Sequence, residues 1–181
     1  MMVLVTGGSG SGKSAFAEEM IVSFGKKKRY YFATMYPYDE ESHKRILRHR
    51  KMREDKDFQT VEQFVDIGKP ELVRESCALL ECMSNLVANE MFLPGGAGAD
   101  CVPAVERGIR ALKEKVSHLV IVTNEIFSEG LIYGDGTDLY MKNLGEINAS
   151  LARMADEVYE VVYGIPIMLK GNFARKGGHP R

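Results

Sequence analysis

The sequence of 181 residues predicts an α/β fold with a largely parallel central sheet. Short apolar runs, typical of buried strands, alternate with longer stretches in which apolar residues recur every three or four positions. A glycine-rich segment at residues 7–12 joins the first apolar run to the first helical stretch. Two closing apolar runs are separated only by Tyr163 and Gly164, which predicts a C-terminal hairpin. We therefore expect one domain over residues 1–170 and a loose tail at residues 171–181.

The predicted strands are short apolar runs bounded by glycine, proline or charged residues. They cover residues 2–6, 30–33, 58–61, 77–80, 119–123, 158–162 and 165–169. The run Leu-Val-Ile-Val-Thr that begins at Leu119 is the clearest, since branched apolar residues dominate it and are typical of buried strands.

The predicted helices carry apolar residues at helical spacing. They cover residues 13–24, 39–52, 85–92, 102–116 and 139–154, with a further short helical piece at 71–75. Gly25 is expected to end the first helix. The second helix is polar with few apolar residues, so we expect it on the outside of the molecule. Residues 94–98, Pro-Gly-Gly-Ala-Gly, predict a loop.

The composition is typical of a soluble globular protein, with 45% hydrophobic and 27% charged residues. A formal net charge of -1 gives no general attraction to nucleic acid or to an acidic membrane. Cys77, Cys82 and Cys101 have no metal-ligand spacing and suggest buried thiols in a reducing compartment. We find no apolar run long enough to span a bilayer and no signal-peptide pattern. We therefore expect a cytoplasmic protein that neither binds nucleic acid nor inserts into membranes.

A phosphate-binding motif, G-x-x-x-x-G-K-S, lies between the first predicted strand and the first predicted helix. Its members are Gly7, Gly8, Ser9, Gly10, Ser11, Gly12, Lys13 and Ser14. In this context the glycines let backbone N–H groups point at phosphate oxygens, and the helix adds its positive N-terminal end. Lys13 is expected to reach the β- and γ-phosphates, and the Ser14 hydroxyl to hold Mg²⁺. The motif predicts binding of a nucleoside triphosphate. The alternative is a flexible Gly/Ser turn.

Three predicted strands are followed by polar residues, at the sheet edge where α/β proteins place their working groups. Thr34 follows the second strand, Glu81 follows the strand at 77–80, and Thr123-Asn124-Glu125 ends the strand at 119–123. Glu81 occupies the place where enzymes with this motif put the carboxylate associated with Mg²⁺. The alternative is a carboxylate that caps a neighbouring helix.

A basic stretch at residues 45–53 places Arg45, His49 and Arg53 on one helical face. Two flanking guanidinium groups favour the neutral form of the imidazole, and this form is a nucleophile. The same guanidinium groups would neutralise the charge of the phosphates that the imidazole attacks. The stretch therefore fits a site that carries a phosphoryl or nucleotidyl group on histidine. The alternative is a basic helix that only faces solvent.

Several short motifs match a known family in order along nearly the whole chain, from Met2 to about Lys170. They are Leu4-Val5-Thr6-Gly7-Gly8, Ala33-Thr34, Arg45-Ile46 with His49, Arg50 and Arg53, Thr60-Val61-Glu62, Leu79-Leu80-Glu81-Cys82 with Asn85 and Asn89, Val122-Thr123-Asn124-Glu125, Gly145 with Asn148, Ala155-Asp156-Glu157-Val158, and Gly164-Ile165-Pro166. On these motifs the chain resembles the bifunctional adenosylcobinamide kinase/adenosylcobinamide-phosphate guanylyltransferases of cobalamin biosynthesis.

The resemblance implies a two-step enzyme with a RecA-like P-loop NTPase fold that assembles as a homotrimer. It implies phosphorylation of the aminopropanol hydroxyl of adenosylcobinamide, a corrinoid, by ATP or GTP. GMP is then transferred from GTP to that phosphate through a guanylylated histidine, and pyrophosphate is released. The family's nucleophile falls on His49.

The resemblance also implies the residues that contact the nucleotide and its metal. Besides residues 7–14 they are Thr34, Met35, Tyr36, Arg50, Lys51, Met52, Arg53, Glu62 and Glu81. Ser14 and Glu81 are the residues expected at Mg²⁺, while Lys13 and His49 are the expected catalytic residues.

The chain departs from the family pattern at four places. Met141-Lys142 replaces an Arg-Asp pair, Ala149 replaces a glutamine, and Phe127-Ser128-Glu129-Gly130 replaces a glycine-rich stretch. The interior of the phosphate-binding loop, Gly-Ser-Gly-Ser, lacks a cation that relatives often place there. We expect these changes where a corrinoid or a neighbouring subunit is contacted.

Two other functions remain open from the sequence. One is a P-loop kinase of a different small alcohol, without guanylyl transfer. The other is a nucleotide-dependent regulatory module without turnover, in which the basic stretch contacts a phosphate backbone. The slightly negative net charge and the lack of a basic stripe with interleaved aromatic residues argue against the second.

Overall fold

The computed structural model describes residues 1–125 and 135–172, without the side chains of Arg45, Met52 and Asp135. Two features of the sequence, the departure at 127–130 and most of the expected loose tail (173–181), lie outside these described residues.

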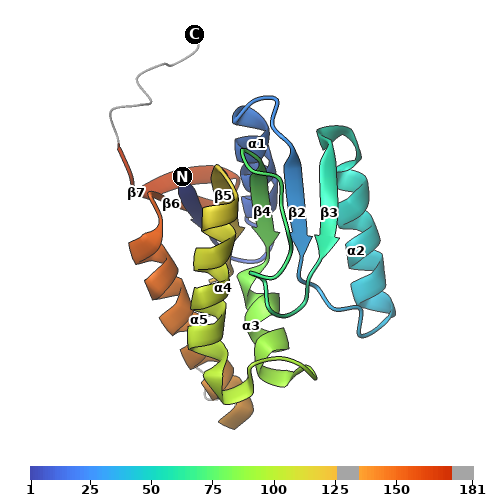
Figure 1. The fold of residues 1–181 in the computed structure, drawn as a ribbon, viewed down its shortest axis with the longest axis vertical. Helices are drawn as coiled ribbons and strands as arrows, with labels where there is room; N and C mark the ends of the chain where they lie inside the picture. Colours follow the sequence, from blue (N-terminus) through green and yellow to red (C-terminus); the bar gives the residue numbers. More distant parts are fainter. Residues whose placement is uncertain (126–134, 173–181) are drawn as a thin grey trace.

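A seven-stranded sheet in the order β3-β2-β4-β5-β1-β6-β7 forms the centre of the molecule (Figure 1). Its strands are β1 Met2–Thr6, β2 Arg29–Ala33, β3 Phe58–Glu62, β4 Cys77–Glu81, β5 His118–Val122, β6 Glu157–Val162 and β7 Ile165–Lys170. All neighbouring strands are parallel except β6 and β7, which form an antiparallel hairpin. The predicted parallel α/β sheet and closing hairpin are confirmed.

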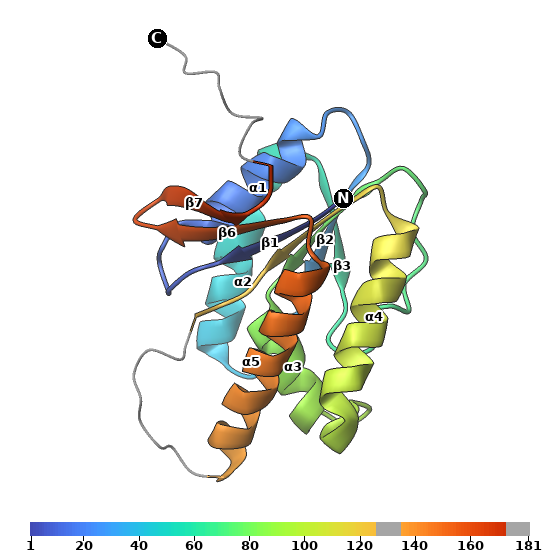
Figure 2. The same ribbon diagram turned by 90° about the vertical axis from the view of Figure 1, so that its left-hand side faces the viewer.

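Five α-helices and two short 3₁₀ helices surround the sheet in the described parts of the chain. They are α1 Lys13–Ser23, α2 Glu40–Met52, η1 Glu54–Lys56, α3 Met83–Phe92, η2 Gly98–Asp100, α4 Cys101–Lys115 and α5 Asp135–Met154. Figures 1 and 2 show α3, α4 and α5 together on one face, with α1 on the other and α2 beside β3. Because β3, β2, β4, β5 and β1 run parallel, their carboxyl ends lie side by side along the same end of the sheet.

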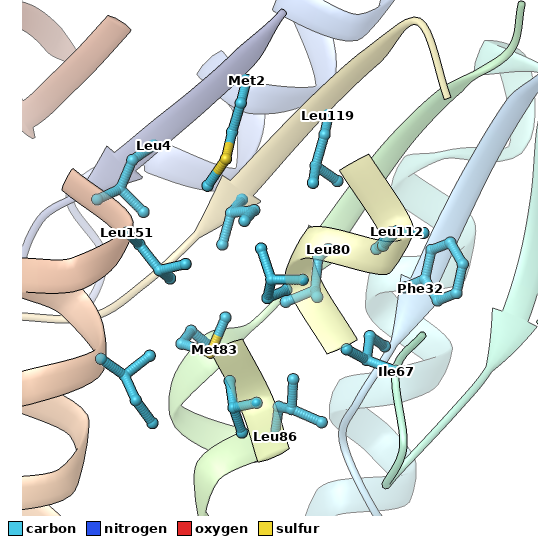
Figure 3. Close-up of a cluster of buried hydrophobic side chains, with 14 of the residues drawn as sticks. Met2, Leu4, Phe32, Ile67, Leu80, Met83, Leu86, Leu112, Leu119 and Leu151 are labelled. Carbon is cyan, nitrogen blue, oxygen red and sulfur yellow. The ribbon is translucent and has the colours of Figure 1, made fainter. Parts of the chain in front are cut away.

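The core consists of two apolar layers, one on each face of the sheet, since alternate strand residues point to opposite faces. On one face Leu4, Leu80 and Ile121 pack against α3, α4 and α5 (Figure 3). On the other, Val5 and the other alternate residues pack against α1. Burial on both faces explains why β1, β4 and β5 are continuous apolar runs and not alternating ones.

Helix α2 lies on the outside, as its polar sequence predicts. Asp39 caps it by accepting a 2.7 Å hydrogen bond from the Ser42 backbone N–H, and the Ser42 side chain accepts one from the Asp39 backbone in return. Its apolar Leu47 is 63% exposed. The N-terminal cap therefore contributes more to this helix than the burial of apolar side chains such as Leu47.

The helix expected at residues 71–75 is absent, and that prediction was wrong. This segment has no regular secondary structure, and Glu75 has a φ of 63°, which no right-handed helix contains. Four of its five residues are exposed. It is held in an extended path by a few contacts, in which Glu71 pairs with Lys115, Leu72 packs on the core and the Val73 N–H donates to the Tyr30 hydroxyl. So short a piece with so little to bury cannot offset the cost of starting a helix.

His118, at the start of β5, is stacked on Phe24 with ring centroids 4.1 Å apart. Burial lowers the pKa of His118 from its ordinary value of 6.5, and the N-terminal ammonium and Lys27 lower it further. The unfolded chain therefore binds a proton on this residue at a higher pH than the folded one. Its contribution to stability is complete above about pH 6.5 and is lost as the pH falls through the folded value.

We therefore expect urea denaturation to show a free energy of unfolding that declines as the pH is lowered from 7.5 to 5. In His118→Phe, which keeps an aromatic ring against Phe24 and cannot be protonated, this decline should become shallower. Replacement of the exposed His43 by glutamine is the matched control and should keep the wild-type slope. Identical slopes in wild type and His118→Phe would show that His118 does not contribute to the pH dependence.

None of the helices in the described residues is long and apolar enough to cross a membrane.

Candidate active site

The glycine-rich loop follows β1 and leads directly into α1, as the sequence predicts. Gly12 caps α1 with a left-handed φ of 91°. Gly7 has a φ of 152°, and a Cβ there would lie 2.6 Å from the carbonyl oxygen of Val161 on β6. The Gly164 N–H donates a 2.8 Å hydrogen bond to the carbonyl of Ser11. The loop is thus held between the sheet and the β6–β7 turn, where only glycine fits at residue 7.

Lys13, the first residue of α1, is 7% exposed, and its ammonium donates a 2.9 Å hydrogen bond to the Gly8 carbonyl. Burial lowers its pKa, while Cys82 and Glu81 act in the opposite direction. Burial raises the pKa of the neighbouring Cys82 thiol, which keeps that thiol neutral. A buried ammonium beside a neutral thiol and a row of backbone N–H groups is suited to receive the negative charge of a phosphate.

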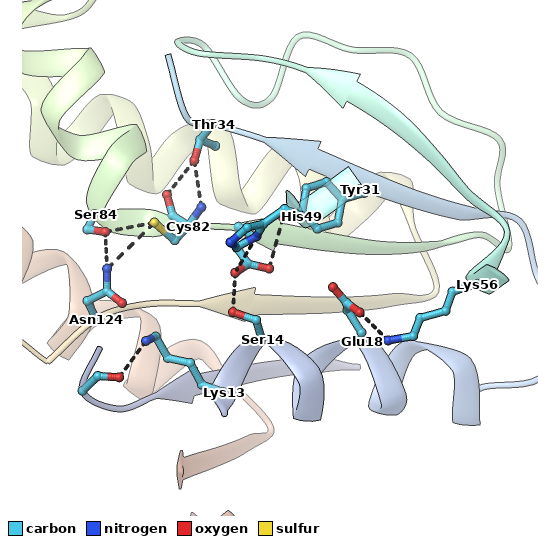
Figure 4. A network of polar contacts seen from close by, with 12 residues as sticks. Lys13, Ser14, Glu18, Tyr31, Thr34, His49, Lys56, Cys82, Ser84 and Asn124 are labelled. Carbon is cyan, nitrogen blue, oxygen red and sulfur yellow. Dashed lines mark hydrogen bonds and ion pairs between the residues drawn. The ribbon is translucent and has the colours of Figure 1, made fainter. Parts of the chain in front are cut away.

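Glu81, the last residue of β4, connects the loop to helix α2 (Figure 4). Its Oε1 accepts a hydrogen bond from the Ser14 hydroxyl and lies 3.9 Å from His49 Nδ1. Its Oε2 accepts a 3.1 Å hydrogen bond from the Tyr31 hydroxyl. The alternative role of Glu81 as a helix cap does not fit, because the following helix α3 begins without a side-chain cap.

Arg53, at the C-terminal end of α2, is 5% exposed and stacks on Tyr31, with its guanidinium carbon 3.3 Å from the ring centroid. Burial raises the pKa of Tyr31, and the Glu81 carboxylate raises it further, so its hydroxyl stays a donor. Nε and Nη1 of Arg53 have no hydrogen-bond partner among the described residues. A buried guanidinium with unused donors is suited to bind an anionic ligand.

A cavity of about 540 Å³ lies in front of the loop at the carboxyl edge of the sheet. Its lining comes from the loop, the ends of β2, β4 and β5, and the inner side of α2. The lining residues are Ser9, Gly10, Ser11, Gly12, Lys13, Ser14, Ala15, Tyr31, Ala33, Met35, Ile46, Arg48, His49, Arg50, Arg53, Glu81, Cys82, Asn85, Val122 and Asn124. The cavity therefore brings together the loop, His49, Arg50, Arg53 and Glu81.

The other residues expected from the sequence are not part of the lining of this cavity. They are Gly7, Gly8, Thr34, Tyr36, Lys51 and Glu62, while the side chain of Met52 lies outside the description. Thr34 is buried, and its hydroxyl donates to the carbonyl of Cys82 and accepts from its N–H, each at 2.8 Å. Thr34 thus positions the chain after Glu81. Glu62 pairs with Arg50, and Tyr36 packs on Phe64 with ring centroids 5.1 Å apart.

The structure adds a contact of His49 that the helical spacing does not indicate. The sequence places His49 between Arg45 and Arg53, but Arg53 ends the helix and turns onto the ring of Tyr31. The side chain of Arg45 lies outside the description. In addition, Nδ1 of the imidazole lies 3.9 Å from a carboxylate oxygen of Glu81, which comes from β4. A carboxylate opposite Nδ1 favours the tautomer with its proton on that atom, so that the other nitrogen, Nε2, can act as a nucleophile.

Sequence reasoning did not assign a role to several cavity residues. Tyr31, Cys82, Asn85 and Asn124 were not among the predicted contacts, although the polar group after β5 includes Asn124. In the sequence, Tyr31 stands out only as a member of an apolar strand. Its place near the site follows from the strand order. Strand β2 lies directly beside β4, and Tyr31 is two positions before the end of β2.

Comparison with known proteins identifies the same family as the sequence motifs. The family model described as cobinamide kinase/cobinamide phosphate guanyltransferase matches residues 3–169. The bifunctional adenosylcobalamin biosynthesis protein CobU of Escherichia coli is 33% identical, and the protein of the same name from Salmonella typhimurium is 32% identical. Each alignment covers 94% of this chain and 100% of the relative.

Among solved structures, the KaiC-like protein PH0186 of Pyrococcus horikoshii is similar, with a TM-score of 0.51 and 12% sequence identity. The alignment covers 96% of this chain and 81% of that protein. At this identity the similarity concerns the fold alone, and it supports the RecA-like P-loop architecture.

Proposed function

This chain belongs to the cobinamide kinase/cobinamide phosphate guanyltransferase family, and we propose that it performs two consecutive reactions of cobalamin biosynthesis in the cavity described above. In the first, adenosylcobinamide is phosphorylated by a nucleoside triphosphate, either ATP or GTP. In the second, GMP is transferred from GTP to the new phosphate, which gives adenosylcobinamide-GDP and pyrophosphate.

The observation that carries this proposal is the position of Glu81 between the phosphate-binding loop and His49. Its Oε1 accepts a hydrogen bond from Ser14 and lies 3.9 Å from His49 Nδ1. One cavity thus holds a loop suited to the β- and γ-phosphates and a histidine suited to attack a phosphorus atom. A P-loop kinase without guanylyl transfer would have no chemical use for the histidine.

The residues present fit Mg²⁺, which the family's chemistry implies. Ser14 and Glu81 bring a hydroxyl and a carboxylate oxygen into contact at the cavity wall. Mg²⁺ at nucleotide sites commonly takes one or two protein oxygens and completes its shell with phosphate oxygens and water. The described residues hold no cluster of three or more His, Cys, Asp or Glu that would form a complete protein cage. Bound there, Mg²⁺ would neutralise phosphate charge.

In the kinase reaction the protein mainly positions and neutralises the triphosphate. The loop N–H groups and Lys13 hold the phosphates while the alcohol oxygen of cobinamide attacks Pγ. The bond between Pγ and the bridging oxygen breaks, and its electron pair stays on the β-phosphate. In the structure the Lys13 ammonium donates to the Gly8 carbonyl, and its two further N–H groups remain for phosphate oxygens.

In the guanylyl reaction His49 divides one displacement into two. Its Nε2 bonds to Pα of GTP, the bond from Pα to the bridging oxygen breaks, and pyrophosphate leaves. The imidazolium formed is stabilised by the carboxylate of Glu81 opposite Nδ1. A phosphate oxygen of cobinamide phosphate then attacks Pα and releases neutral His49. The cavity residues Arg50 and Arg53 are suited to hold the phosphates during both steps.

Incubation of the protein with Mg²⁺ and GTP labelled at the α- or γ-phosphate tests this function. We expect α-label to attach to the protein through an acid-labile bond, and γ-label to pass to cobinamide when it is added. Product formation from cobinamide phosphate should then remove the α-label. Phosphorylation of cobinamide without protein labelling would favour a kinase alone. Absence of any cobinamide-dependent turnover would favour the regulatory module and overturn the proposal.

We also propose that the enzyme works in the cytoplasm as a homotrimer, as its family resemblance implies. The edge strand β7 supports an interface between copies, because Ile165, Ile167 and Leu169 are 65%, 46% and 55% exposed. An exposed row of apolar side chains on an edge strand is typical of a surface that is covered by another chain.

A further inference from the structure

Asn124 follows β5 and lies against the base of the phosphate-binding loop. The N–H groups on either side of it are bound to β1 and the loop: Thr123 N–H donates to the Val5 carbonyl at 2.9 Å, and Glu125 N–H to the Gly7 carbonyl at 3.2 Å. The backbone around Asn124 is therefore fixed relative to the loop. Its side chain lines the same cavity as Lys13 and Cys82.

The amide of Asn124 is held in one orientation. Its Nδ2 donates a 2.7 Å hydrogen bond to the Ser84 hydroxyl and lies 3.9 Å from the Cys82 sulfur (Figure 4). Ser84 is itself fixed, since its hydroxyl contacts the Cys82 sulfur at 3.0 Å and its carbonyl accepts a 3.2 Å hydrogen bond from Tyr140 on α5. Both amide hydrogens are thus directed at the protein, and no described residue donates to the amide oxygen, Oδ1.

An amide oxygen in this place selects for a particular kind of ligand group. It accepts hydrogen bonds and cannot donate one, so it is unsuited to a phosphate oxygen, which Lys13 and the loop N–H groups already serve. A hydroxyl group, by contrast, can donate to it. Because Lys13 reaches the β- and γ-phosphates in such loops, an acceptor that lines the same cavity as Lys13 is suited to the group that attacks the γ-phosphorus.

We propose that Asn124 binds the hydroxyl group of the alcohol that is phosphorylated, and that Ser84 and Tyr140 are positioning residues that hold its amide. This inference rests on the proposed kinase function and adds the acceptor subsite to it. The alcohol O–H donates to Oδ1, which turns a lone pair of the alcohol oxygen toward Pγ. As the new P–O bond forms and the bond to the β-phosphate breaks, the hydroxyl proton passes to a phosphoryl oxygen and then to solvent.

The test compares Asn124→Ala with wild type in two assays on the same preparation. In the first, phosphorylation of cobinamide, we expect kcat/KM for cobinamide to fall on the order of 10²-fold, as when a reacting group loses its alignment. In the second, labelling of the protein by α-labelled GTP alone, we expect the rate and the KM for GTP to stay at wild-type values, because that reaction has no alcohol. Ser84→Ala should lower only the first rate, by about tenfold, through a less ordered amide.

Asn143→Ala is the matched control, because Asn143 lies on α5 with its amide on the Met91 sulfur and outside the cavity lining. It should retain both activities. An equal loss of both activities in Asn124→Ala would indicate damage to the loop and overturn the assignment. A raised KM for GTP would make Asn124 a phosphate contact and would also overturn the assignment. An unchanged rate of cobinamide phosphorylation would overturn it as well. Failure of the wild-type protein to phosphorylate cobinamide would instead overturn the proposed function, and this subsite with it.

Discussion

His49→Ala should lose guanylyl transfer and keep cobinamide phosphorylation. We expect covalent labelling by α-labelled GTP, and formation of the GDP derivative of cobinamide, to fall by on the order of 10³-fold or more. We expect the kinase rate to stay within about threefold of wild type, since positioning of the γ-phosphate depends on the loop and Mg²⁺. The measurement is a pair of assays with α- and γ-labelled GTP on one preparation.

The physical reason is that no neighbouring group can replace the imidazole. Glu81 is directed at Ser14 and Tyr31, and burial keeps the Cys82 thiol protonated. His49 is 28% exposed, lines the cavity and belongs to neither apolar layer of the core, so its replacement widens the cavity and leaves the core intact. The variant should therefore fold, and the kinase assay on the same preparation checks this.

His43→Ala is the matched control, because His43 lies on the same helix and is exposed, with its ring nitrogen on the Asp39 carbonyl. It should retain both reactions. Persistent acid-labile labelling in His49→Ala would show that another residue carries the nucleotide. A parallel loss of both reactions would show that His49 serves the shared triphosphate site and is not a separate nucleophile.

Most of the sheet could be predicted from the sequence because local pattern and tertiary position agree there. The strands β1, β4 and β5 are buried on both faces, so their sequences are continuous apolar runs bounded by turn or polar residues. The amphipathic spacing of α4 likewise matches the face that it buries. The helix predicted at 71–75 does not form because four of its five residues are exposed, so it has too little apolar surface to bury.

The order of the strands could not be predicted, and much of the site depends on it. Tyr31 reaches Glu81 because β2 and β4 are neighbours, although 50 residues separate the two side chains in the chain. Asn124 reaches Ser84 in the same way from β5. The phosphate-binding loop was predictable because all of its residues are contiguous. The partner of His49 was not, because Glu81 comes from another element and helical spacing indicates only neighbours on the same helix.

Glu81→Gln should lower the rates of both reactions, because it removes the negative charge that lies beside both Ser14 and His49. We expect kinase and guanylyl rates each to fall by roughly 10²-fold or more, and the Mg²⁺ concentration for half-maximal rate to rise. Glutamine keeps the shape and one acceptor oxygen, so one of the Ser14 and Tyr31 hydroxyls can still donate to it while the other accepts from its amide N–H. The loss therefore reports mainly on charge. The measurement is the rate of each reaction over a range of Mg²⁺ concentrations.

The Mg²⁺ series separates the two roles assigned to the carboxylate. If Glu81 acts on the metal, high Mg²⁺ should restore part of the kinase rate in Glu81→Gln. If it also stabilises the imidazolium of His49, the guanylyl rate should stay low at every Mg²⁺ concentration, since Mg²⁺ cannot replace an anion beside Nδ1. Glu71→Gln, at a position where the carboxylate is 94% exposed and pairs with Lys115, is the matched control. A kinase rate that is unchanged at low Mg²⁺ would remove Glu81 from the metal site, and equal restoration of both reactions would remove it from His49.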